Sequence, residues 1–311
     1  MKIYKGLENF KRPKKSIVTT GTFDGVHKGH LQIINELCSK EQEEESVLIT
    51  FFPHPRLLLY PDQDLKLINT LEEKVELFKK HDIDHLIIQN FDFNFSRMSS
   101  LDYIRDFLLK KIGLSKLIIG YDHHFGRNRE SSLDVLREYS ELYGFKIVTV
   151  PPFKEDNISV SSTKIRNYLQ LGNIDLANKL LGYKFSFNGR VVSGDGIGKS
   201  LGFPTANLEV FDLNKVIPGI GVYAVRVHVK GVKYLGMLNI GKKPTFEKES
   251  PITIELHILD FNQNIYNEEI QLMIFSKLRR EIKFDSKEKL ILQLEEDELR
   301  VRNYFNRLSS Y

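Results

Sequence analysis

The hydrophobic pattern of this chain changes near residue 182, and that change constrains the fold more than any other feature. Before it, short apolar runs alternate with helix-length amphipathic segments. The expected strands are 16–20, 46–52, 84–89, 116–120 and 145–150, and the expected helices are 28–40, 70–81, 99–111 and 130–143. Such alternation predicts right-handed crossovers and an α/β domain with a doubly wound parallel sheet. Ligands of these sheets bind beyond the carboxyl ends of the strands.

After two short helical segments, at 162–171 and 173–181, strand-like runs follow one another with only turn residues between them. These runs are 185–192, 221–229, 233–240, 252–259 and 269–278. Their spacing favours a small antiparallel barrel or sandwich. A charged amphipathic helix is expected at 285–308, with Leu290, Leu294, Leu299 and Phe305 on its apolar face. We therefore expect two domains, residues 1–182 and 183–311, and the length is sufficient for both.

Composition excludes several classes of protein. The single cysteine, Cys38, leaves no intrachain disulfide and no cysteine-rich zinc site. No run approaches the ~20 apolar residues of a membrane helix, and the N-terminus lacks the apolar core of a signal peptide. We therefore expect a cytoplasmic protein without a membrane partner. The formal net charge of +4 is small and dispersed, whereas a nucleic-acid binder more often concentrates charge on one face, and phosphate-bearing small ligands fit this excess equally well. Charge therefore does not decide between these partners, and we expect small phosphate-bearing ligands and no nucleic acid. The sequence leaves open whether the chain forms a weak homo-oligomer.

The first candidate site follows the first expected strand, in Gly21-Thr-Phe-Asp-Gly-Val-His-Lys-Gly-His30. His27 and His30 are three residues apart and share one face of the first helical turn. A helix N-terminus favours phosphate, and two imidazoles there can donate to phosphate oxygens as charge builds during nucleotidyl transfer. Gly25 and Gly29 permit close approach of the backbone. The alternative, a turn with incidental histidines, does not account for the paired spacing among three glycines.

Two further segments of the first part have candidate ligand-binding residues: one follows the last expected strand and opens a helix, and the other lies at the end of a strand. Ser161-Ser162-Thr163-Lys164-Ile165-Arg166 has hydroxyls and basic groups that suit a polyphosphate, although alone it fits a hydroxyl-capped helix with solvated charges equally well. Gly120-Tyr-Asp-His-His-Phe-Gly-Arg127 contains adjacent histidines, which rarely ligate one metal ion together. We therefore expect this second loop to contact a base, ribose or flavin.

The second part contains Gly194-Asp-Gly-Ile-Gly-Lys-Ser-Leu-Gly-Phe-Pro-Thr-Ala-Asn207. A P-loop has four residues between its first glycine and its Gly-Lys pair, whereas this segment has three. A dinucleotide fingerprint would read G-x-G-x-x-G and open a helix after a strand, so this segment is neither motif. Backbone N–H groups of such a loop can bind phosphate, and the oxygens of Thr205 and Asn207 suit Mg²⁺. The alternative is an ordinary hairpin loop.

The motifs of the first part resemble the FAD synthetase module of the bifunctional bacterial riboflavin kinase/FAD synthetases, which are HxGH nucleotidyltransferases. Matching segments are Gly21 to His30, Phe52-Pro-His-Pro55, Gly120 to Gly126 and Ser161 to Arg166. The resemblance implies that His27, His30 and Arg166 stabilise charge during adenylyl transfer. It also implies ligand contacts from Gly21, Phe23, Asp24, Gly29, Asp122, Ser161, Ser162 and Thr163. Phe52 and Ser131-Ser132 depart from the family pattern, which has an acidic residue and a glycine there.

The second part resembles riboflavin kinases, which fold as six-stranded antiparallel barrels. The matches are Gly202-Phe-Pro-Thr-Ala-Asn207, Ile217 to Tyr223, Gly236 to Gly241 and Ile254 to Ile258. The resemblance implies that Thr205 and Asn207 hold Mg-ATP and that Glu255 is the base. Further ATP contacts are implied for Gly194, Gly196, Gly198, Lys199 and Pro204. By pattern alone, Glu255 is only a polar residue between Ile254 and Leu256, and a solvent-facing strand position would be favoured.

The expected function is therefore bifunctional flavin cofactor synthesis. The resemblance implies that the second domain phosphorylates riboflavin to FMN, with ATP as co-substrate and Mg²⁺ as cofactor. It implies that the first domain adenylylates FMN to FAD and releases pyrophosphate. Two alternatives remain: a related nucleotidyltransferase that acts on another phosphate acceptor, and a non-catalytic flavin- or RNA-binding protein on the same scaffold.

Overall fold

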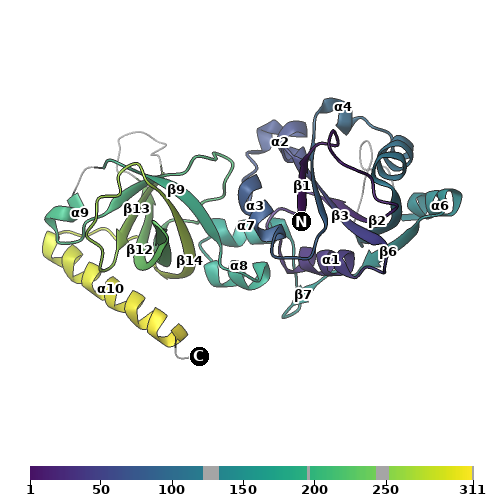
Figure 1. Ribbon diagram of the computed structural model, residues 1–311. Coiled ribbons are helices and arrows are strands. Elements are labelled where there is room, and N and C mark those ends of the chain that lie inside the picture. Colours follow the sequence, from purple (N-terminus) through teal and green to yellow (C-terminus); the bar gives the residue numbers. More distant parts are fainter. Residues whose placement is uncertain (122–132, 195–196, 243–251, 310–311) are drawn as a thin grey trace. The chain divides into compact units, whose positions relative to one another are not determined.

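The computed structural model describes residues 1–121, 133–194, 197–242 and 252–309 (Figure 1). The chain divides into two compact units, Met1–Ser162 and Thr163–Tyr311, and each is described by itself. Helix α8 (Ile174–Leu181) belongs to the second unit, in which it packs against the barrel strand β14 (Glu269–Arg279). The domain boundary at residue 182 stays a prediction. In the described ranges, no helix combines the length and apolarity needed to cross a membrane.

The first unit is built on a six-stranded sheet in the order β1-β4-β3-β2-β5-β6, and every neighbouring pair is parallel. Its strands are β1 (Lys2–Lys5), β2 (Lys15–Gly21), β3 (Glu44–Phe52), β4 (His85–Asn90), β5 (Leu114–Gly120) and β6 (Lys146–Val150). The parallel α/β prediction is confirmed. The edge strand β1 was not expected, because its lysine-flanked four residues contain no apolar run.

Helices cover both faces of this sheet, so alternate strand residues enter two separate cores. Helices α1 (Lys28–Cys38) and α3 (Leu71–Phe78) pack on one core, and η2 (Tyr103–Ile112) with α6 (Leu133–Tyr143) pack on the other. Thr70 and Glu73 form a capping box at the start of α3. Short elements complete the unit: α2 (Pro55–Leu59), η1 (Pro61–Gln63), α4 (Phe93–Ser96), α5 (Ser100–Asp102), β7 (Lys154–Glu155) and β8 (Ile158–Ser159).

The second unit is a closed antiparallel barrel with the strand order β10-β13-β12-β11-β14-β9. The remaining barrel strands are β9 (Ser186–Val192), β10 (Ala206–Glu209), β11 (Gly221–Val229), β12 (Val232–Lys242) and β13 (Ile252–Ile258). This confirms the six-stranded barrel. Strand β10 was missing from the hydrophobic pattern because it has only four residues, and the short helix α9 (Ile197–Ser200) precedes it. Helix α7 (Ser162–Gln170) leads into α8.

Helix α10 (Lys287–Ser309) packs on the outside of the barrel, where Val301 and Phe305 meet Phe275 and Met237. The aromatic rings of Phe275 and Phe305 meet edge to face, with centroids 4.8 Å apart. The prediction that Leu299 belongs to the apolar face is wrong, since its side chain is 58% exposed. Residues four apart share a helix face, so Val301 lies beside Phe305, whereas Leu299 is rotated away.

Candidate active sites

The turn after β2 has an uncommon backbone. Phe23 and Val26 have φ values of 49° and 34°, a left-handed region that is costly for side chains with a Cβ, and Gly25 has a φ of 88°. Phe23 is buried and makes edge-to-face contacts with Phe78 and His30, with centroids 5.9 and 5.2 Å away. The aromatic packing of Phe23 therefore holds the strained turn against the first helix.

Hydrogen bonds fix the same turn from three other segments. The buried Asp24 carboxylate accepts from the amides of Ile68 at 2.9 Å and Asn69 at 3.3 Å. The ammonium of Lys74, on α3, donates to the Thr22 carbonyl at 2.9 Å. The Ser162 hydroxyl donates to the main-chain oxygen of Asp24 at 2.8 Å. Asp24 and Ser162 thus shape the turn, and their predicted ligand contacts stay predictions.

The histidine pair lies where the turn enters α1. The rings of His27 and His30 stack with centroids 3.6 Å apart and an interplanar angle of 14°. His27 caps the helix, because its Nδ1 accepts a hydrogen bond from the His30 amide at 3.2 Å. A ring nitrogen that accepts carries no proton, so the neutral ring of His27 has its proton on Nε2. The geometry gives His27 a defined tautomer and a donor nitrogen.

His30 is the more deeply desolvated ring of the pair. Its Nδ1 is buried and has no hydrogen-bond partner among the described residues. Burial, with repulsion from His27 and Lys74, holds the pKa of His30 well below its ordinary value. His30 is therefore neutral near pH 7. An anion that binds beside it would favour its protonated form.

The glycines of this turn leave space for aromatic rings. A Cβ on Gly29 would lie 3.3 Å from the His27 ring, and a Cβ on Gly21 would lie 3.2 Å from the Phe23 ring.

Arg166 and Thr163, in α7, belong to the second unit, and the Arg166 side chain is buried. Asp122 and its loop lie outside the described residues. The part of the chain that is described contains no group of three His, Cys, Asp or Glu side chains that suits a metal ion.

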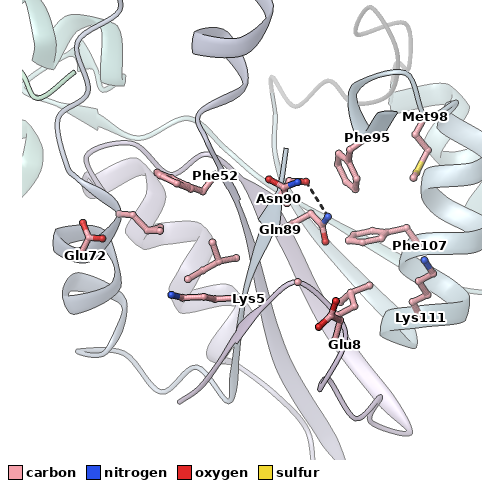
Figure 2. A pocket seen from close by; sticks show the side chains of 14 residues that line it. Lys5, Glu8, Phe52, Glu72, Gln89, Asn90, Phe95, Met98, Phe107 and Lys111 are labelled. Carbon is pink, nitrogen blue, oxygen red and sulfur yellow. Dashed lines mark hydrogen bonds between the residues drawn. The ribbon is translucent and has the colours of Figure 1, made fainter. Parts of the chain in front are cut away.

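A pocket of about 680 Å³ opens at the carboxyl ends of β1, β3 and β4 (Figure 2). Aromatic and apolar side chains line much of it, including Phe52, Phe95, Met98 and Phe107. Gln89 and Asn90 supply amide groups, and the Gln89 amide donates to the Asn90 carbonyl at 3.1 Å. Its volume is in the range of small-molecule sites, and Lys5, Glu8, Glu72 and Lys111 add charged groups to its lining. Sequence reasoning missed it because its residues come from distant segments.

In the second unit, three polar residues form a row across neighbouring barrel strands. Asn207 on β10 is the register partner of Glu255 on β13, and Glu255 is also the partner of Asn239 on β12. Directly opposed residues have Cβ atoms about 4.5–5.5 Å apart, so these side chains meet on one face. Glu255 is half-buried, unlike the solvent-facing residue that its pattern alone would favour. Asn239 was missed because it alternates with apolar residues like any outward position on a strand.

The glycine loop lies directly against this row. An added Cβ on Gly194 would be 1.7 Å from Nδ2 of Asn207, and one on Gly198 would be 2.9 Å from the Thr205 hydroxyl. The Pro204 carbonyl accepts from the His257 ring at 2.8 Å, which fixes the chain just before Thr205. Side-chain oxygens of Thr205, Asn207 and Glu255 are hard donors that suit magnesium. Gly196 and the side chain of Lys199 lie outside the described residues.

Fold and sites together define the class of protein. The first unit has a histidine pair at a helix N-terminus beyond a parallel sheet, the arrangement of a nucleotidyl-transfer domain. The second has a glycine loop beside Thr, Asn and Glu side chains on a barrel, an arrangement suited to phosphoryl transfer. Residues 9–164 match the family model described as FAD synthetase, and residues 181–305 match that described as riboflavin kinase.

Relatives match over the full length. The chain is 37% identical over 313 residues to the bifunctional riboflavin kinase/FMN adenylyltransferase of Buchnera aphidicola subsp. Schizaphis graminum, covering 98% of this chain and 99% of the relative. It is 34% identical to the protein of that name from Escherichia coli strain K12, with 98% of each covered. The chain belongs to the family of bifunctional riboflavin kinase/FMN adenylyltransferases.

A solved structure has the same fold over nearly the whole chain. It is a crystal structure named as a macrolide-efflux protein from Streptococcus pneumoniae, with a TM-score of 0.87 and 30% sequence identity. The match covers 97% of this chain and 98% of the other. Both domains therefore occur, in this order, in a chain that has been crystallised.

Proposed function

We propose that the barrel domain phosphorylates riboflavin to FMN with ATP, and that the parallel-sheet domain adenylylates FMN to FAD with release of pyrophosphate. The matches to both family models, in N- to C-terminal order, together with the relative that matches over 98% of the chain, carry this proposal. The two candidate sites are the histidine pair at the start of α1 and the Asn207–Glu255–Asn239 row on the barrel. Both reactions consume ATP, and a cytoplasmic location fits that requirement.

In adenylyl transfer, an FMN phosphate oxygen attacks the α-phosphorus of ATP and pyrophosphate leaves. The attacking phosphate is already an anion, so this reaction needs no general base. Catalysis then consists of positioning and charge stabilisation, to which the Nε2 proton of His27 and the N-terminus of α1 contribute. His30 and Arg166 are assigned the same stabilising role. The aromatic-lined pocket lies at the same edge of the sheet and suits the flavin ring.

In phosphoryl transfer, the terminal ribityl hydroxyl oxygen attacks the γ-phosphorus of ATP and ADP leaves. Glu255 accepts the proton of that hydroxyl during the attack. The flanking amides of Asn207 and Asn239 orient the carboxylate and the phosphate oxygens. Thr205 and Asn207 would hold magnesium, which neutralises phosphate charge when bound. The close packing of Gly194 and Gly198 on these residues supports a phosphate-binding role for the loop.

Two sets of substitutions in the full-length chain test whether the reactions occupy separate sites. The double variant His27→Ala/His30→Ala is expected to abolish FAD formation from FMN and to leave FMN formation intact. Glu255→Gln is expected to slow FMN formation by about 10²–10⁴-fold, the usual scale for loss of a general base, and to leave adenylyl transfer intact. Both rates are measured by chromatography of the flavins.

Matched controls are His81→Ala, on the chain just after α3, and Glu209→Gln, at an exposed position of β10 beside the candidate kinase site. Neither control is expected to change either rate. If the double histidine variant, correctly folded, lost both activities, the assignment of one reaction to each domain would be wrong. A near-normal kinase rate in Glu255→Gln would remove Glu255 from the role of base.

A further inference from the structure

Lys74, on α3, is a buried cation next to the turn that carries the histidine pair. Its side chain is 7% exposed, and its hydrogen bond goes to the Thr22 carbonyl at 2.9 Å. Among the described residues it forms no ion pair. An ammonium has three N–H donors, and burying such a charge without a paired carboxylate is costly. A neutral side chain would fill the same space at lower cost, so the charge itself calls for an explanation.

The surroundings of Lys74 point toward the candidate nucleotide site. Its acceptor, Thr22, begins the strained turn that carries the histidine pair. The titratable groups that face it are Asp24 in the turn and His30 on α1, with His27 stacked on His30. The Asp24 carboxylate accepts from the two amides before α3 and attracts the Lys74 ammonium electrostatically. The positive charge of Lys74 therefore acts on the turn and on His30.

Burial lowers the pKa of Lys74 from 10.5 to about 8, and Asp24 opposes this shift. The ammonium thus remains mostly protonated at pH 7 and loses its proton only about one unit above that. Phosphate groups that arrive at the N-terminus of α1 would add negative charge to that of Asp24 in the surroundings of Lys74. This combination of cost and location is typical of functional sites rather than of packing.

We propose that Lys74 is a positioning residue for adenylyl transfer, which fixes the Thr22 carbonyl at the start of the turn and places a buried positive charge beside the histidine pair, where nucleotide phosphates would bind. The inference rests on the adenylyltransferase function proposed above. It assigns to α3 a part in the chemistry that neither the glycine turn nor the histidine spacing indicates.

The test compares Lys74→Met with Lys116→Met in the full-length chain. Lys116 is a matched control because its side chain is also largely buried. It pairs with Glu44 at the amino ends of the strands, away from the histidine pair. For Lys74→Met, kcat/KM for ATP in adenylyl transfer should fall at least about tenfold, somewhat less than loss of a direct transition-state donor. Lys116→Met should be unchanged, and the kinase reaction should be unchanged in both variants.

A pH profile separates a role of the charge from mere structural support. In the unmodified protein, kcat/KM for adenylyl transfer should decline above about pH 8 as Lys74 loses its proton. In Lys74→Met that alkaline decline should disappear. The thermal midpoint at pH 7 should stay the same or rise, because a buried charge whose desolvation outweighs the attraction of Asp24 has been removed. A lowered midpoint with an unchanged pH profile would show that Lys74 only supports the fold.

One readout does not depend on activity. In chains with ¹³C-labelled histidine, the His30 resonance is assigned by its loss in His30→Gln, and its pKa is measured by titration. The His30 pKa should rise in Lys74→Met and stay the same in Lys116→Met. An unchanged pKa would overturn the proposal. If the unmodified chain made no FAD, the proposed function would fail, whereas this titration would still decide whether Lys74 controls His30.

Discussion

His30 owes its neutral state to its surroundings. Burial comes first, followed by repulsion from His27 and Lys74, and all three lower its pKa. In the unfolded chain the same ring titrates near the ordinary value of about 6.5. Between the two values the unfolded state binds more protons than the folded state, so stability rises with pH in that window. The folded state is therefore destabilised relative to the unfolded state as the pH falls below about 6.5.

This difference gives a prediction for stability. Acidification from pH 7.5 to pH 5 should lower the thermal midpoint of the first unit less in His30→Gln than in the unmodified chain, because the variant lacks the depressed pKa. Calorimetry of both proteins across this range measures the effect, and other titrating groups cancel in the comparison. Parallel curves for the two proteins would contradict the depressed pKa of His30.

Single residues differed in how well the sequence predicted them. His27 and His30 were found because their spacing puts both on one helical face, and the structure stacks their rings. Lys74 was missed, since a lysine near the start of an amphipathic helix has the pattern of a solvated residue. Its hydrogen-bond partner is 52 positions away in the chain. Only the tertiary fold brings such a pair together.

Among the structural elements, long buried strands were predicted well and short ones were not. Apolar runs identified β2 to β6, because a sheet covered on both faces needs apolar residues at successive positions. Strands β1 and β10, four residues each, lack such runs and are specified by their neighbours in the sheet. The missed strand β10 holds Asn207, so the register that aligns Asn207 with Glu255 was invisible in the sequence.

The glycine loop gives a prediction about an element. In Gly194→Ala the new Cβ would lie 1.7 Å from Nδ2 of Asn207, so the loop or the amide must move. Misplacement by about 1 Å in a site can cost about 10²-fold, and we expect a loss of that order in FMN formation. Adenylyl transfer of supplied FMN should not change. The control is Gly231→Ala in the β11–β12 turn, where a Cβ meets no atom within 4 Å.

The outcome that counts against the loop assignment is a Gly194→Ala protein with the kinase rate of the unmodified chain. A slow kinase in Gly231→Ala as well would indicate general destabilisation of the barrel instead. Because the φ of Gly231 is 81°, that control also carries backbone strain, and it therefore tests the barrel stringently.

For the whole molecule, the change of periodicity was the decisive signal. Strand–helix alternation predicts a parallel sheet covered by helices, whereas strands without helices between them predict an antiparallel sheet or barrel. A chain that contains both patterns is therefore expected to form two folds, and the parallel sheet and the closed barrel confirm this expectation. The site residues were predictable only as far as motifs carried them. Partners such as Asn239, His257 and Lys74 depend on strand register and on packing between distant segments, which no local pattern encodes.

The central claim is that one chain converts riboflavin to FAD in two ATP-dependent steps. The most direct test incubates the purified full-length protein with riboflavin, ATP and magnesium and follows the flavins by chromatography over time. FMN should appear first and FAD should follow, with both absent when ATP is omitted. Unchanged riboflavin, together with no conversion of supplied FMN by the folded, ATP-binding protein, would contradict the account.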